Sequence, residues 1–504
     1  MQNTLSAVSF ERFYQSIGLE RYPFRERTAE KENTSELFIK PLDYSRLHDD
    51  LASNHSVVVS GNRGSGKTIT LLDLKAKIDS NRVFCLIDQF ESVKPENNQL
   101  DFYSLILQHL TKSVLIFISN NRKCLKKISQ DDKVLLSFLI MKYGDSITDN
   151  QLYSTLEGVQ LSWIKRIINR ISVPLTTLAN YGTTAVTNFG NELLTKHFGA
   201  YLPEISEGTV KKIFPDIQFP VENQFKSVPI SFSLLDSALK MFTRLAGNIP
   251  VVLIDKLDED MRLENDAELV SKFFKDLVCN NNLLLNPNIQ LVISVWEIPF
   301  QYLSTVFRES KVSVYYIQWD KPQLEIVLNH RLSVYSSKQV SDYRDLFDSD
   351  VLDSDLDDLY ELSNSNPRDL WGIFDAIFKS QYFIDSSSHL ISRRALIDGL
   401  YKFVENFQFY EYYPRKKNAQ KNTNDIYSYI NYLLKLPKVN EFTNGELRDA
   451  ASTGGSTTNY ITGMMNIGLV KKTDRKRPGG AVIYQINDPK VSYAIFHEID
   501  IQHN

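Results

Sequence analysis

The sequence has little of what several classes of protein require. It contains only three cysteines, Cys85, Cys124 and Cys279, and their wide spacing excludes a disulfide framework and a cysteine-based metal site. No apolar run approaches the roughly 18 residues of a membrane-spanning helix. The N-terminus lacks the basic segment and apolar stretch of a signal peptide. We therefore expect a cytoplasmic protein with no membrane partner.

An excess of either charge sign is also lacking. The 57 lysines and arginines face 61 acidic residues, a net charge of −4, so the whole chain is not an electrostatic nucleic-acid binder. Such a contact would need a local basic patch. Two occur near the C-terminus, one of Arg415, Lys416, Lys417 and Lys421, and one of Lys471, Lys472, Arg475, Lys476 and Arg477. The length of 504 residues predicts about three globular domains.

The strongest motif is the run GNRGSGKT at residues 61–68, which matches G-x-x-x-x-G-K-[ST]. A β-branched run precedes it at 56–60 and a helical pattern follows at 69–78, the strand–loop–helix setting of a P-loop. The residues predicted to bind ATP are Gly61, Asn62, Arg63, Gly64, Ser65, Gly66, Lys67 and Thr68. Lys67 would reach the β- and γ-phosphates, and the Thr68 hydroxyl would ligate Mg²⁺.

A second strand is expected to supply the acidic groups that a P-loop needs. Residues 249–255 form an apolar run ending in Asp255, as in a central parallel strand. Asp255 is placed to hold Mg²⁺. Either Asp258 or Glu259 would polarise the attacking water, and we favour Glu259.

Two further strands, at 82–88 and 288–295, fit the same sheet. The tip of the second offers Ser294 and Glu297 as sensors of the γ-phosphate, although a buried serine bonded to its own backbone explains Ser294 equally well. Arg308 lies at the end of the helix expected after this strand. It is either an arginine finger for a neighbouring subunit's ATP or an ordinary exposed arginine.

The rest of the chain divides around this core. We predict an N-terminal strap at 1–50, a P-loop core at 51–320 and a helical insertion at about 100–230, with helical patterns at 101–118, 130–143 and 152–171. A helical lid follows at 321–410. Within it, Asn366 and Pro367 are typical of a helix start, and Arg368 in that first turn faces either the nucleotide or solvent.

Residues 421–504 have the pattern of a winged helix. A helix is expected at 426–434, and a capping box at Thr443–Glu446 opens a second helix ending at Ala451. A third helix at 456–467 begins with polar residues, and two strands at 469–472 and 481–486 flank a basic tip. Such a module binds double-stranded DNA through the second helix of its helix-turn-helix motif and through its wing. Alternatively, it packs against protein and its basic tip is solvated.

In order, GNRGSGKT, VVLIDKLDED, SNPRDLW and the winged helix resemble AAA+/STAND P-loop ATPases, both origin-recognition-type initiators and NACHT-like switches. The resemblance implies an α/β fold, a P-loop NTPase parallel sheet with a helical lid and a C-terminal winged-helix domain. It also implies ATP rather than GTP, and an N-terminal segment that wraps the adenine or merely closes the core. Asn364 and Ser365 stand where initiators usually have glycine before Asn366.

Three functions are compatible with these motifs. The leading hypothesis is an ATP-dependent conformational switch with slow hydrolysis, which controls self-assembly or engagement of a protein partner, with DNA and anti-phage defence as candidate settings. The second is an oligomeric ATPase that loads or remodels DNA and uses Arg308 in trans. The third is a scaffold or transcriptional regulator that binds ATP without hydrolysing it.

Overall fold

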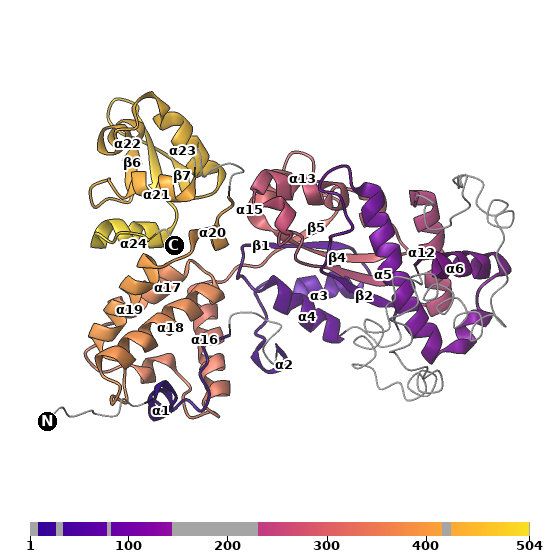
Figure 1. Ribbon diagram of the computed structural model, residues 1–504, viewed down its shortest axis with the longest axis horizontal. Coiled ribbons are helices and arrows are strands. Elements are labelled where there is room, and N and C mark those ends of the chain that lie inside the picture. Colours follow the sequence, from indigo (N-terminus) through magenta and orange to yellow (C-terminus); the bar gives the residue numbers. More distant parts are fainter. Residues whose placement is uncertain (1–8, 27–33, 78–81, 144–229, 416–424, 503–504) are drawn as a thin grey trace, which may run out of the picture.

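The computed structural model describes residues 9–26, 34–77, 82–143, 230–415 and 425–502. The helical pattern predicted at 152–171 and three lysines of the first basic patch lie outside these ranges. Figure 1 shows a sheet with its helices at one end of the molecule, and a helical unit with the winged helix at the other.

A parallel sheet forms the core, in the order β2-β3-β4-β1-β5. Every neighbouring pair is parallel, and β1 lies between β4 and β5. The strands are β1 (Val57–Gly61), β2 (Phe84–Ile87), β3 (Val251–Ile254), β4 (Gln290–Trp296) and β5 (Ser313–Tyr316). This confirms the predicted α/β fold with a parallel P-loop sheet. The edge strand β5 had not been recognised as a strand.

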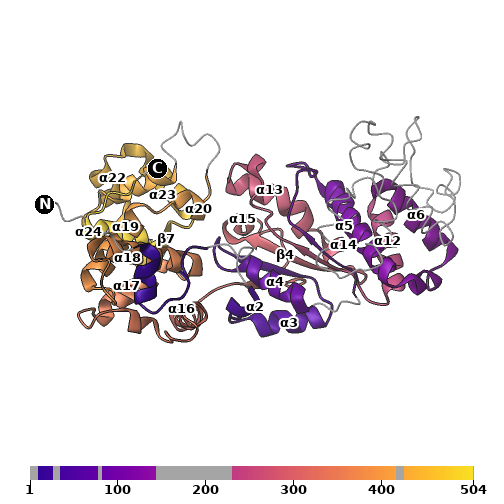
Figure 2. The same ribbon diagram turned by 60° about the horizontal axis from the view of Figure 1, so that its bottom comes forward.

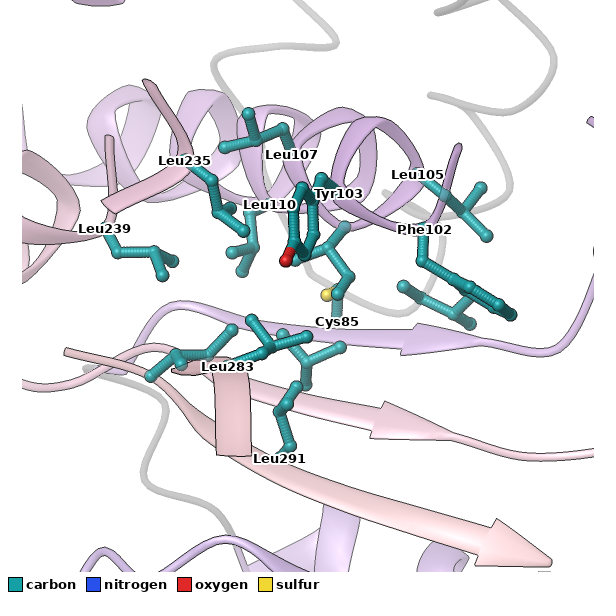
Figure 3. Packing of buried hydrophobic residues seen from close by; sticks show 14 of the residues in the cluster. Cys85, Phe102, Tyr103, Leu105, Leu107, Leu110, Leu235, Leu239, Leu283 and Leu291 are labelled. Atoms are coloured by element: carbon teal, nitrogen blue, oxygen red, sulfur yellow. The ribbon is translucent and has the colours of Figure 1, made fainter. Parts of the chain in front are cut away.

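Helices cover both faces of the sheet (Figure 2). On one face lie α3 (Tyr44–Ala52) and the P-loop helix α4 (Lys67–Lys77), and on the other lie α5 (Gln99–Asn120) and α13 (Ala267–Val278). Figure 3 shows the second face, where leucines and aromatic rings of α5 and α12 pack over β2 and β4. The short helices α14 (Asn281–Leu284) and α15 (Glu297–Gln301) flank β4.

The described part of the predicted insertion is helical. It consists of α5, the 3₁₀ helix η2 (Arg122–Lys126) and α6 (Gln130–Tyr143), which pack with α12 (Phe232–Ala246) in one apolar core. The helix at 130–143 begins and ends where its pattern predicts.

The lid is built from α16 (Lys321–Tyr335), α17 (Asp353–Ser363), α18 (Pro367–Ile384) and α19 (Arg393–Glu405). The N-terminal helix α1 (Phe10–Ser16) lies against α18 (Figure 1). Phe24 stacks on Phe374 of α18 at 5.0 Å between ring centroids. The first half of the predicted strap therefore belongs to the apolar core of the lid.

The C-terminal unit has winged-helix order, with an antiparallel sheet β6-β8-β7. Its elements are α21 (Ile426–Leu433), β6 (Glu441–Thr443), α22 (Asn444–Ala451), η8 (Gly454–Ser456), α23 (Thr457–Asn466), β7 (Val470–Lys476), β8 (Val482–Ile486) and α24 (Pro489–His497). The capping box of Thr443 and Glu446 is confirmed. A short helix, α20 (Phe409–Tyr412), joins this unit to the lid.

One predicted local structure is wrong. The helix after β4 ends at Gln301 instead of continuing to Arg308. Successive turns follow, fixed by Phe300, Leu303 and Phe307, whose side chains are buried in the core under β4. Two 3₁₀ helices, η5 (Met261–Leu263) and η6 (Tyr343–Leu346), and α2 (Thr34–Leu37) complete the described elements. No helix within the described ranges is both long and apolar enough to cross a membrane.

Candidate nucleotide-binding site

A cavity of about 530 Å³ opens where β1 and β3 end, beneath the first turn of α18. Its volume is within the range of small-molecule sites. The P-loop, the acidic turn after β3, the lid and the segment Leu37–Ile39 all contribute to its walls. The motifs predicted separately therefore meet in one place.

Three hydrogen bonds to backbone carbonyls brace the P-loop. Lys67 Nζ donates hydrogen bonds to the carbonyls of Gly61 at 2.8 Å and Asn62 at 3.0 Å. The indole of Trp319 donates to the Ser65 carbonyl at 2.8 Å. Burial lowers the pKa of Lys67, and the nearby carboxylates of Asp258 and Asp255 oppose that shift. The amine thus lies inside the loop with acidic groups close by.

The acidic strand meets the P-loop helix through two side chains. Thr68 Oγ1 donates to Asp255 Oδ2 at 2.8 Å, and Asp255 is buried at the end of β3. A hydroxyl beside one carboxylate is the pair that holds Mg²⁺ in P-loop enzymes. No group of three or more His, Cys, Asp or Glu side chains able to hold a metal occurs in the described ranges, and nucleotide-bound Mg²⁺ needs only one or two carboxylates.

The two carboxylates proposed for water activation have different surroundings. Asp258 is buried and accepts a hydrogen bond from Arg63 Nε at 2.7 Å, while the Arg63 guanidinium lies 4.1 Å over the Trp296 ring. Glu259 is exposed and lines the same cavity. Although the Glu259 side chain is exposed to solvent, partial desolvation by the cavity walls and then the charge of Asp258 raise its pKa.

The lid touches the P-loop directly. Asn366 caps α18 by accepting from the Arg368 amide, and its Nδ2 donates to the Arg63 carbonyl at 2.7 Å. A Cβ added at Gly64 would lie 2.6 Å from Asn366 Oδ1 and 2.8 Å from Arg368 Cβ. Only glycine allows this approach, because Gly64 also has φ +85°.

Arg368 is half-buried and lines the cavity. Its Nε is buried with no hydrogen-bond partner in the described part of the chain, which is costly for a charged donor unless a ligand engages it. Buried Ser65 Oγ in the P-loop is orphaned in the same way. A polyphosphate would be bound by these donors, by the backbone amides at the start of α4 and by Lys67. Its Mg²⁺ would be held by Thr68 and Asp255.

The remaining predicted residues are spread around the site. Glu297 follows β4; burial raises its pKa, and the charge of Lys67 opposes that shift. Ser294 is buried within β4, opposite Val59, and its hydroxyl has no partner among the described residues. Arg308 is exposed in the turns after α15 and lines neither the 530 Å³ cavity nor the larger groove beside it.

That larger groove, about 1480 Å³, runs from the acidic turn along α18 to α20. It shares Asp258, Glu259 and Arg368 with the smaller cavity. The acidic side of the site is therefore open toward the lid and the connection to the winged helix.

No known protein family matches this chain, and no curated protein does. Among solved structures, the Aeropyrum pernix ORC2 protein in its ADPNP–ADP complexes matches over 96% of this chain and 98% of its own, at 11% identity and a TM-score of 0.39. Its ADP form matches over 90% of this chain and 92% of its own, at 10% identity and a TM-score of 0.32. Drosophila ORC bound to DNA matches over 98% of this chain and 93% of its own, at 11% identity and a TM-score of 0.29.

These matches to origin-recognition (ORC) proteins each cover at least 90% of this chain. All three TM-scores are below 0.5, so roles in ATP or DNA binding do not transfer from these proteins. The roles of individual residues rest on the geometry of this chain.

The sequence patterns missed several residues at the site. Trp319 supports the P-loop. Arg331 lines the cavity from α16, with its guanidinium 4.7 Å from the Trp371 ring. Tyr412 accepts from Asn62 Nδ2 at 3.3 Å. None lies in a motif, and Trp319 gave no signal because the strand that precedes it, β5, was not predicted.

Proposed function

We propose that this protein is an ATP-binding and ATP-hydrolysing conformational switch of AAA+/STAND type, which controls assembly or engagement of a partner. One observation carries the proposal. The lid's Asn366 donates to the P-loop carbonyl of Arg63, so that Arg368 shares one cavity with Lys67. A γ-phosphate bound there would be contacted from both the core and the lid.

Each proposed role follows from placement. Lys67 binds the β- and γ-phosphates, and Arg368 contacts the γ-phosphate from the lid. Glu259, whose carboxylate has no hydrogen bond or ion pair within the described ranges, accepts a proton from the attacking water. Thr68 and Asp255 would hold Mg²⁺, which neutralises phosphate charge when bound.

Asp258 has a supporting role in this scheme. Its carboxylate is engaged by Arg63 at 2.7 Å, and its backbone carbonyl accepts from the same guanidinium at 3.0 Å. The pair fixes the turn that carries Glu259. Hydrolysis would remove the group that Arg368 contacts, and a ligand shifts a conformational equilibrium only through such differential contacts.

Double-stranded DNA is a candidate partner of the winged helix. Lys471, Lys472 and Lys476 are exposed on the wing, whereas Arg475 pairs with Glu441 and Arg477 lies 3.5 Å from Glu446. The exposed Thr458 and Asn459 open α23, the helix that would enter the major groove. The DNA-loading alternative adds Arg308 as a finger in trans, for which its exposed position leaves access.

The switch is tested by its shape in two nucleotide states. We expect the full chain to show different small-angle X-ray scattering profiles with a non-hydrolysable ATP analogue and with ADP. The Lys67→Ala variant should show one profile in both. Identical wild-type profiles, with both nucleotides shown to be bound by calorimetry, would contradict a switch.

A further inference from the structure

The last helix of the winged helix contacts the first turn of the lid helix that carries Arg368. Lys490, the second residue of α24, is fully buried, and its Nζ lies 2.8 Å from Asp369 Oδ2 in α18. The two groups form a buried ion pair. Asp369 directly follows Arg368 in the chain.

The ammonium group of Lys490 is enclosed by aromatic rings and carboxylates. It lies 4.4 Å from the centroid of Phe407 and 5.3 Å from that of Tyr412. Burial acts to lower the pKa of Lys490, but the charges of Asp369 and Asp488 outweigh it and raise the pKa overall. A charged lysine therefore sits between the winged helix and the lid.

Tyr412, one of these two aromatic residues, also contacts the P-loop. The hydroxyl of Tyr412 accepts from Asn62 Nδ2 at 3.3 Å and from Asn364 Nδ2 at 3.1 Å. The next residue, Tyr413, donates to Asp488 Oδ2, the cap of α24, at 2.7 Å. Figure 1 shows α20, which carries Tyr412, at the junction of the winged helix, the lid and the sheet. P-loop, lid and winged helix thus meet at one buried polar cluster.

We propose that Lys490 and Tyr412 are positioning residues for the nucleotide site. Lys490 holds Asp369 and thereby sets the direction in which Arg368 faces the γ-phosphate, while Tyr412 holds Asn62 of the P-loop. The inference rests on the proposed function and adds its regulation: displacing α24 from the lid lowers the preference for ATP over ADP. By linkage, ATP then favours the seated winged helix to the same degree.

The test measures dissociation constants of ADP and of a non-hydrolysable ATP analogue on the full chain. Removing Lys490 alone would strand a buried carboxylate, so the informative variant carries Asp369→Asn and Lys490→Met together. Tyr412→Phe deletes only the hydroxyl. The matched control is Lys438→Met, which removes an exposed ion pair of the same unit, 3.0 Å from Glu498.

We expect the paired variant to lower the ADP-to-ATP-analogue ratio of dissociation constants about tenfold, within the usual range of coupling between sites. ADP affinity should change less than about twofold in this variant, and Lys438→Met should leave both constants unchanged. Because Lys490 acts through Arg368, adding the paired change to Arg368→Ala should cause no further loss. Tyr412→Phe should weaken binding of both nucleotides.

A purely structural role gives a different result. In the paired Asp369→Asn and Lys490→Met variant, it would lower the melting temperature and weaken both nucleotides in parallel, with the ratio unchanged, which would overturn the inference. So would a further loss of ratio in the Arg368→Ala background. If wild type and Lys67→Ala bind ATP equally, the proposed function itself fails, and this inference with it.

Discussion

Arg63 distinguishes the two carboxylates that follow the acidic strand. It holds Asp258 at 2.7 Å and leaves Glu259 exposed to the cavity. The sequence pattern offered both carboxylates for water activation and favoured Glu259, but their directions are set by the left-handed turn at Lys256, with φ +61°, which sequence does not show.

Glu259→Gln should lower ATP turnover by a factor of about 10² or more, the usual contribution of a general base, and leave ATP affinity nearly unchanged. Steady-state phosphate release and calorimetry measure the two. Asp258→Asn is the companion variant: it frees Arg63 and should impair binding as well as turnover. Full turnover in Glu259→Gln would refute the assignment.

The same glutamate predicts a pH dependence. Only ionised Glu259 accepts a proton, so kcat should fall as the pH is lowered through its pKa. Partial desolvation and the charge of Asp258 raise that pKa, so the acid limb of the kcat profile should lie above the value of about 4.3 for free glutamate. A profile that is flat from pH 7 down to about 4.3, with the chain still folded by circular dichroism, would contradict this.

Gly64 tests the contact between the lid and the P-loop. Gly64→Ala puts a Cβ 2.6 Å from Asn366 Oδ1, and we expect ATP affinity to drop at least about tenfold as the lid is pushed away. Gly454→Ala is the control, since Gly454 also has positive φ, at +59°, but open space around it. Equal ATP binding by wild type and Gly64→Ala would show that the contact is dispensable.

At the scale of elements, periodic segments were predicted well and contact-dependent ones were not. Helix α6 begins and ends as its pattern indicates, and the amphipathic helices α12 and α13 each bury one continuous apolar face. The edge strand β5 and the five-residue α15 give weak local patterns. Their structure depends on pairing with β1 and on packing under β4, which neighbouring residues in the sequence do not encode.

The loop before α18 explains a departure from the initiators. Asn364 and Ser365 adopt φ +51° and +56°, the left-handed region that favours glycine. This chain keeps the turn without glycine, and Asn364 uses its side chain to donate to Tyr412. The motif therefore predicted the position of the turn, while its side-chain bonds were visible only in the fold.

The exposed lysines of the wing lead to a prediction about DNA binding. Charge swaps at the exposed Lys472 and Lys476 should weaken binding of double-stranded DNA and reduce the salt dependence of the affinity by about two charges. Arg475 is a poorer choice, because its pairing with Glu441 makes a swap disturb the sheet. Lys275→Glu on α13 is the control. Unchanged affinity and salt slope in the wing variant would remove DNA from the proposed partners, or relocate its binding surface.

At the scale of the whole molecule, the lid and the P-loop face of the sheet share one apolar core. Residues of α4, β1 and α16–α19 belong to it, together with Phe13 and Phe24 of the N-terminal segment. The sequence indicated these units separately, but could not place the N-terminal aromatics in the lid, because the contacts span 350 positions or more. The domain boundaries themselves are still predictions.

ATP turnover by the purified full chain is the most direct test of whether this site hydrolyses ATP. We predict slow phosphate release that disappears in Lys67→Ala and persists in Lys75→Ala, a change on the exposed side of the same helix. Repeating the assay with double-stranded DNA shows whether DNA sets the rate. Absence of turnover in wild type, or equal turnover in wild type and Lys67→Ala, would contradict the claim that this site hydrolyses ATP.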